Sequence, residues 1–161
     1  MLVGRNLKKY NNLWRKDVLM GVRIQTRLLE SMKFEATLPT GHTVIMDSDE
    51  KVGGNNEGPR PYHLVAVALA GCTGMDVLSI LRKKRQLVTN FFIDIQAEQS
   101  EDYPKVYENI SIHYHITGRS IDPVAVERSI ELSETKYCPV IANLRKDADI
   151  QTQYTIYELK E

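Results

Sequence analysis

Apolar and polar residues alternate in short stretches along the first third of the chain. The alternation predicts strands over residues 22–28, 32–38 and 42–47. The sequence Pro39-Thr40-Gly41 supplies a turn between the second and third of them. Three short strands in this order indicate an antiparallel meander. The following segment, 51–60, is rich in glycine, asparagine and charge and is therefore expected to be a surface loop.

The apolar pattern then changes to a long, nearly continuous stretch. It predicts a helix over 61–84, which begins at Pro61, a residue that suits the first helical position. The stretch ends in a run of cations, Arg82 to Arg85, which suit the negative end of the helix dipole. A carboxylate at Asp76 would be costly in a bilayer, so we expect a helix buried in protein.

The second half of the chain returns to strands and then to shorter helices. The pattern predicts strands over 91–99, 106–117 and 150–159 and helices over 122–136 and 138–146. Strands and helices come in blocks, which is typical of an α+β fold with an antiparallel sheet. Residues 1–20 form an N-terminal extension, either a short amphipathic helix or a loose tail, ahead of a single domain over 21–161.

Charge and length narrow the classes of function. The chain has 161 residues, enough for one domain, with 21 basic and 21 acidic residues. No net field favours nucleic acid or an anionic membrane surface. The N-terminus lacks the order of a secretory signal, so a cytoplasmic location is expected. In that compartment two cysteines are expected to be thiols.

The two cysteines are the leading candidates for chemistry. Cys72 lies in a stretch of small residues within the long helix, where the alternative is an inert core residue. Cys138 precedes Pro139, so it should begin a helix whose amides would lower the pKa of its thiol. The alternative for Cys138 is a buried capping residue. The cysteines lie far apart in sequence and form no CxxC pair, so no metal site is predicted.

Other polar residues give weaker signals. His113 and His115 alternate on a strand and should share one sheet face, either as half of a metal site or as a solvated surface. The glycine-rich segment from Gly53 to Gly58 lacks the spacing of either phosphate-binding loop, so no nucleotide cofactor is predicted.

Two stretches around the cysteines resemble the OsmC/Ohr family. The first runs from Gly58 to Val77 and contains Ala-Gly-Cys-Thr-Gly-Met-Asp. The second is Tyr137-Cys138-Pro139-Val140. The expected order of strands and helices is similar to that of the family from about residue 22 onward.

The resemblance implies an OsmC-like fold, with antiparallel sheets wrapped around long central helices in an intertwined homodimer. It also implies a thiol-dependent peroxidase that defends against oxidative stress. Cys72 would attack an organic hydroperoxide as the peroxidatic thiolate, and Cys138 would resolve the resulting sulfenic acid. An external dithiol reductant protein would restore the pair, with no cofactor and no metal.

The sequence departs from the family's peroxidases at one point. Those enzymes pair a glutamate near the start of the cysteine helix with an arginine from an early turn. Here Tyr62-His63 stands in the first region, and the early turn has no arginine. Arg60 and His63 are therefore the candidate activating or orienting residues. The alternative function is a non-catalytic protein of the same fold that binds a small ligand near Cys72.

Overall fold

The computed structural model describes residues 21–159, so the helix or tail predicted for residues 1–20 lies outside the described residues. The chain forms two compact units, Met1–Arg60 and Pro61–Glu161. The prediction of one domain over 21–161 stays a prediction.

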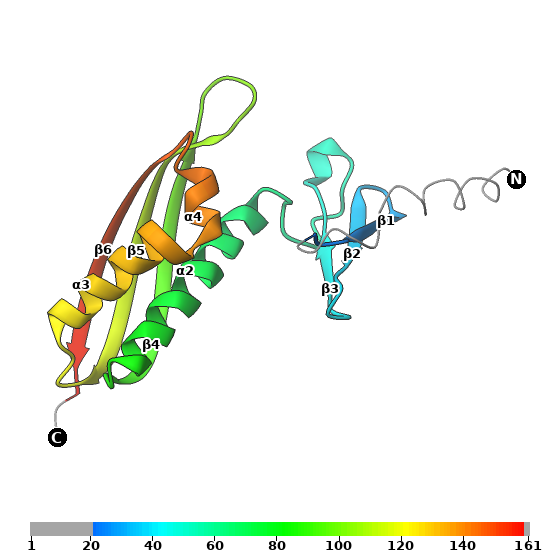
Figure 1. Ribbon diagram of the computed structural model, residues 1–161. Helices are drawn as coiled ribbons and strands as arrows, with labels where there is room; N and C mark the ends of the chain where they lie inside the picture. The colour runs from blue at the N-terminus through cyan, green and yellow to red at the C-terminus, as the bar shows by residue number, and fades with distance from the viewer. Residues whose placement is uncertain (1–20, 160–161) are drawn as a thin grey trace, which may run out of the picture. The chain divides into compact units, whose positions relative to one another are not determined.

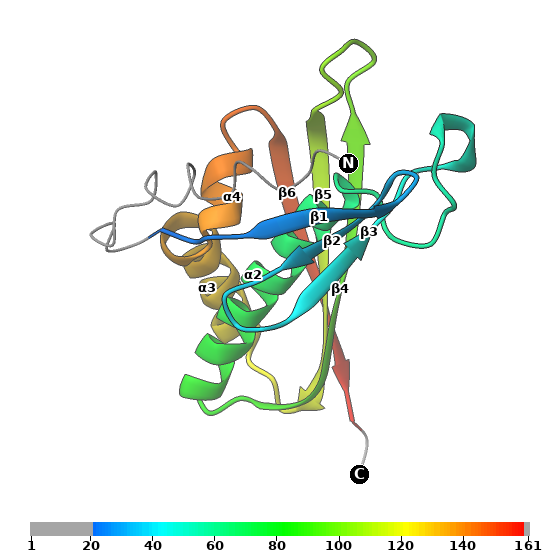
Figure 2. The same cartoon turned by 90° about the vertical axis from the view of Figure 1, so that its right-hand side faces the viewer.

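The first unit is built on a three-stranded antiparallel sheet. Its strands are β1 (Gln25–Glu30), β2 (Lys33–Thr37) and β3 (Thr43–Met46), in the order β1-β2-β3. Figure 2 shows the three strands side by side. The predicted meander is confirmed.

Within residues 21–60, little of this sheet is buried. All six residues of β1 are exposed, and Ala36 is the one buried hydrophobic residue among residues 21–60. Leu28 and Met32 are 56% and 46% exposed. A three-stranded sheet needs an apolar face packed against something to be stable, and residues 21–60 by themselves supply no such core.

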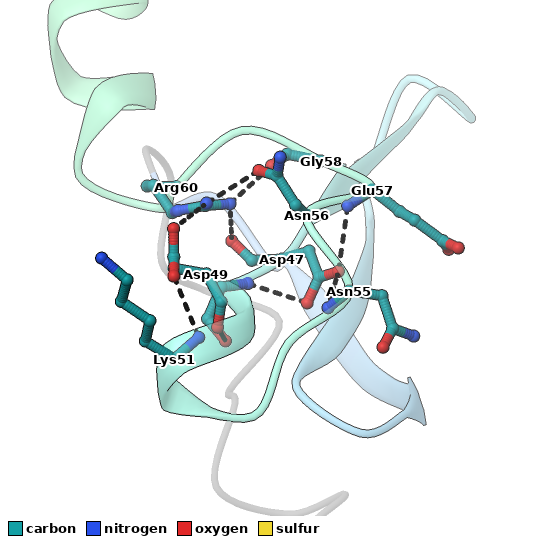
Figure 3. A network of polar contacts seen from close by, with 9 residues as sticks. Asp47, Asp49, Lys51, Asn55, Asn56, Glu57, Gly58 and Arg60 are labelled. Carbon is teal, nitrogen blue, oxygen red and sulfur yellow. Dashed lines mark hydrogen bonds and ion pairs between the residues drawn. The ribbon is translucent and has the colours of Figure 1, made fainter.

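A polar network orders the loop that follows β3 (Figure 3). The carboxylate of Asp47 is almost fully buried and accepts hydrogen bonds from the backbone amides of Ser48, Asn55 and Glu57 at 2.7–3.1 Å. Burial alone would raise the pKa of Asp47, but the three amide donors outweigh it, and the pKa lies below its usual value. The loop predicted over 51–60 is therefore present and well anchored, with a single 3-10 turn at Glu50–Val52.

The second unit contains a mixed sheet. β4 (Leu87–Gln99) pairs antiparallel with β5 (Tyr107–Arg119), and β5 pairs parallel with β6 (Asp149–Glu158). The expectation of purely antiparallel sheets was therefore wrong for β6. Two helices connect β5 to β6, and such a crossover returns the chain to the end of the sheet where β5 began.

Three helices cover one face of this sheet (Figure 1). They are α2 (His63–Lys83), α3 (Pro123–Leu132) and α4 (Pro139–Leu144), and a π turn at Ser133–Tyr137 extends α3. Ile112, Tyr114 and Ile116 point from β5 into the core, where all three are fully buried. The predicted helices and strands of this half are confirmed in type and order, with β4 beginning four residues earlier than expected.

The long helix α2 is buried along one face only. Its buried residues, Leu69, Thr73, Gly74, Val77 and Leu81, follow a helical stripe toward the core. Among the helices of residues 21–159, α2 is the one that is long and apolar enough to cross a membrane. The core helix of a globular protein passes the same test. The expectation of a helix buried in protein is met on the inner stripe, but only 28% of the most apolar stretch is buried, so the outer face is largely exposed in the single chain.

Candidate functional site

Helix α2 presents Cys72 beside its buried stripe. Cys72 precedes the buried Thr73 and is itself half-buried. Asp76 lies four residues later, so its side chain stands on the same side of the helix as Cys72. The helix thus carries a thiol and a carboxylate one turn apart.

Cys138, at the start of α4, lies beside Cys72 although it is remote from it in the sequence. It is the N-cap residue of α4, and its Sγ accepts a hydrogen bond from the amide of Ile141 at 3.4 Å. Its own amide donates to the carbonyl of Ser133 at 2.9 Å, which closes the π turn. Pro139 occupies the first turn of α4, as predicted from the sequence.

The two thiols and the carboxylate converge. The ligand atoms of Cys72, Asp76 and Cys138 all lie within 4.8 Å of one another. Both cysteines are free thiols. Side-chain rotation over such a distance can bring two sulfur atoms to the bonding distance of about 2.05 Å. The arrangement brings together two thiols that are remote in sequence, which is the first requirement for a disulfide between them.

Burial decides the state of the Cys138 thiol. It raises the pKa of Cys138 to about 11, against the opposing hydrogen bond from the Ile141 amide, and the neighbouring Cys72 adds to the increase. The sequence-based expectation of a lowered pKa was therefore wrong. A short helix begins at Cys138 as expected, but the thiol is only 3% exposed, and loss of hydration outweighs the helix amides.

A chain of hydroxyl groups connects the site to the core. Asp76 accepts a hydrogen bond from Ser133 Oγ at 3.1 Å, and Ser133 Oγ lies 2.9 Å from Thr73 Oγ1. Thr73 in turn lies 2.6 Å from the hydroxyl of Tyr114. Burial raises the pKa of Tyr114 to about 12, so its hydroxyl stays protonated. Sequence reasoning missed Asp76, Ser133 and Tyr114, because only the folded chain brings three separate elements together here.

Arg60 and His63 do not join this cluster. Arg60 donates to the carbonyls of Asp47 and Gly58 and to Asn56 Oδ1, which commits its guanidinium to the loop in Figure 3. His63 is exposed at the first residue of α2. Nine residues of helix separate it from Cys72, about 13 Å along the axis.

The paired histidines lie on the sheet face opposite the helices. His113 and His115 share this face, as predicted, with ring centroids 3.9 Å apart. His115 is 8% exposed, stacks on Phe92 and lies 2.9 Å from the hydroxyl of Tyr157 through Nδ1. Its Nε2 lies 3.1 Å from an Asp94 oxygen, but at an angle that makes no hydrogen bond. The expectation of a solvated surface was therefore wrong for His115.

The fold and the cysteine cluster define a small α+β protein with a convergent thiol pair, and comparisons with known proteins identify its family and fold. The model of the family described as OsmC-like protein matches residues 54–153. Protein YhfA of Escherichia coli strain K12 is 31% identical over 135 residues, which cover 84% of this chain and 98% of YhfA. This chain belongs to the OsmC-like family.

Solved structures show the same fold. A hypothetical protein from Aquifex aeolicus is 26% identical with a TM-score of 0.77, over 88% of this chain and all of that one. An organic hydroperoxide resistance protein OsmC from Legionella pneumophila is 14% identical with a TM-score of 0.64, over 85% and 98% of the two chains. The similarity to the Legionella protein concerns the fold alone. The predicted OsmC-like α+β fold is confirmed.

Proposed function

We propose that this protein is a thiol-dependent peroxidase that reduces organic hydroperoxides in defence against oxidative stress. The observation that supports it is the convergence of two free thiols, Cys72 and Cys138, in a family with members named for hydroperoxide resistance. A reduced compartment, the cytoplasm, would keep both thiols available.

The proposed cycle balances with one hydroperoxide and one dithiol. The Cys72 thiolate attacks the distal oxygen of ROOH, the O–O bond breaks, and ROH leaves after it takes up a proton. The sulfenic acid on Cys72 then condenses with Cys138, which releases water and forms a disulfide. An external dithiol reductant protein reduces that disulfide by exchange. The assignment fits the exposures, because Cys72 is half-buried and can meet a substrate, whereas Cys138 is buried.

The activating glutamate–arginine pair of the family's peroxidases is not found beside Cys72 among the described residues 61–159. Asp76 is the charged group beside the thiols, and among residues 21–159 it forms no ion pair. A carboxylate disfavours a neighbouring thiolate. We therefore expect slow turnover unless a cation reaches Cys72 from a partner subunit.

We further propose a homodimer, because the apolar outer face of α2 calls for a partner. Exposed or half-buried residues of this stripe recur at helical spacing: Leu64, Val67, Gly71, Met75 and Leu78. Val67 and Met75 are 61% and 75% exposed. An apolar helical stripe with this spacing is typical of helix–helix packing. The largely uncovered sheet of the first unit would gain a core in the same assembly.

Thiol titration tests the peroxidase proposal. Reduced wild-type protein treated with one equivalent of cumene hydroperoxide should lose two free thiols and release cumyl alcohol. Cys72→Ser should abolish the reaction, whereas the matched Cys138→Ser variant should still consume one equivalent and stop at the sulfenic acid, which dimedone traps. Two thiols that stay reduced under excess hydroperoxide would exclude the proposal.

One observation favours the alternative, a non-catalytic small-ligand protein. An open groove of about 310 Å³ runs between α2 and β4, and its lining is almost wholly apolar: Ala70, Gly71, Gly74, Met75, Leu78, Phe91, Phe92 and Ile93. Cys72 follows Gly71 in the sequence but does not line the groove. Such a groove suits a small apolar ligand. A bound small molecule in protein purified from its host, without consumption of hydroperoxide, would favour this function over the first.

A further inference from the structure

The groups around Cys72 are all metal ligands of negative charge when ionised. They repel one another, whereas a metal ion would attract all three. Two sulfurs and a carboxylate oxygen lie within 4.8 Å of one another. Once the thiols are deprotonated, the set holds three negative charges with no ion-pair partner for Asp76 among residues 21–159. A divalent cation would neutralise most of that charge at the point where the three groups meet.

The three ligand atoms, which lie within 4.8 Å of one another, are near enough for a zinc site to form after side-chain adjustment. Zinc binds thiolate sulfur at about 2.3 Å and carboxylate oxygen at about 2.0–2.2 Å, in a tetrahedron. Tetrahedral ligands at those lengths stand about 3.5–3.8 Å apart, so small side-chain rotations bring the present separations into range. Three protein ligands leave the fourth position to water or an exogenous ligand.

The carboxylate is already oriented for this role. Asp76 accepts a hydrogen bond from Ser133 Oγ, and the chain through Thr73 to Tyr114 fixes Ser133 in turn. Hydrogen bonds of this kind hold the ligands of metal sites in position. The cysteines are held as well, one by the rigid helix α2 and the other at the start of α4. A disulfide cycle alone gives no reason for an oriented carboxylate beside both sulfurs.

We propose that Cys72, Asp76 and Cys138 of the reduced protein bind a thiophilic divalent cation, with Zn²⁺ as the best match. The metal and the disulfide use the same sulfurs, so they exclude each other. Metal binding does not depend on the proposed function, but the release of the metal by hydroperoxide rests on it. One ROOH and two protons convert the two metal-bound thiolates to a disulfide, and ROH, water and Zn²⁺ are released.

Cobalt(II) provides a direct readout, because thiolate coordination gives it charge-transfer and d–d absorption bands. Reduced, metal-free, untagged full-length protein should bind one Co²⁺ per chain with these bands, and Zn²⁺ should displace it. Protein oxidised with diamide should bind none. That comparison needs no variant, so it does not depend on whether a substitution is tolerated.

Variants then assign the ligands. Cys72→Ser and Cys138→Ser should each lose the charge-transfer band, and Asp76→Asn should weaken Co²⁺ binding at least about tenfold. Asp94→Asn is the matched control, because it removes a carboxylate from the opposite face of the sheet and should leave binding unchanged. Absence of the bands in the reduced wild type, or Co²⁺ binding as tight as the wild type's in either cysteine variant, would overturn the proposal.

The metal test is independent of catalysis, since no hydroperoxide is present. Protein that consumes hydroperoxide but binds no Co²⁺ would overturn only the metal site. Protein that binds Co²⁺ through both cysteines but leaves its thiols reduced under hydroperoxide would overturn only the peroxidase.

Discussion

At the scale of single residues, Cys138 shows how two opposing effects on a thiol are resolved. A helix start favours the thiolate, and the sequence reveals that start through Pro139. Burial disfavours the thiolate, and the sequence does not reveal burial. The structure shows that burial prevails. Asp76 was missed for a related reason, because a lone aspartate on an apolar helix becomes part of a site only when α4 is brought against it.

The raised pKa of Cys138 predicts slow alkylation with a distinctive pH dependence. An increase from 9.0 to about 11 leaves about a hundredfold less thiolate at neutral pH than in the unfolded chain. Iodoacetamide should therefore modify Cys138 of the folded, EDTA-treated wild type at least about a hundredfold more slowly than in urea. Since the group is an acid with a raised pKa, the rate should keep increasing with pH toward about 11.

Peptide-level mass spectrometry separates the two cysteines in that experiment, so no variant is required. The urea-unfolded sample is the control for reagent quality. A rate that levels off at or below pH 9 would contradict the assignment of burial as the dominant effect.

At the scale of helices and strands, the sequence predicts elements well and their pairing less well. Turn chemistry and alternation locate the meander of the first unit, and capping residues locate α3 and α4. The parallel pairing of β6 was not predicted, because residues 149–158 alternate in the same way whichever direction they run. Direction depends on the crossover that precedes the strand, which is a property of the assembled layers.

Helix α3 provides a test at this scale, because its N-terminus depends on one side chain. Asp122 caps it by accepting a hydrogen bond from the amide of Val124 at 3.0 Å. Asp122→Ala should lower the free energy of unfolding by about 1 kcal/mol. Asp122→Asn keeps an accepting oxygen and should remain within a few tenths of a kcal/mol of the wild type. Urea unfolding followed by circular dichroism measures both, and an equal loss in the two variants would show that the cap is not the cause.

At the scale of the whole molecule, each of the two units exposes apolar side chains that a stable protein would be expected to bury. The second unit has a core of buried aliphatic residues between its sheet and its helices. Within residues 61–159 the outer stripe of α2 is largely exposed, and within residues 21–60 the sheet β1-β2-β3 is largely exposed. No sequence pattern distinguishes an apolar face that meets the same chain from one that meets a second copy.

The proposed dimer predicts that one charge on this stripe separates the subunits. Met75→Glu places a carboxylate at the centre of the stripe, where a buried unpaired charge is costly, and should shift the protein to monomer. Val124→Glu is the matched control, since Val124 is 68% exposed on α3, away from the stripe. Light scattering after size-exclusion chromatography gives the masses. A wild type that elutes as a monomer at all concentrations would contradict the dimer.

The late position of α4 in the chain has a consequence during protein synthesis. Cys72 leaves the ribosome well before Cys138, which belongs to the last quarter of the sequence. The nascent chain therefore carries an unaccompanied thiol, and under the proposed cycle hydroperoxide met at that stage would leave a sulfenic acid with no neighbour to condense with. In that cycle Cys72 is protected only after Cys138 has been synthesised and α4 has packed against α2.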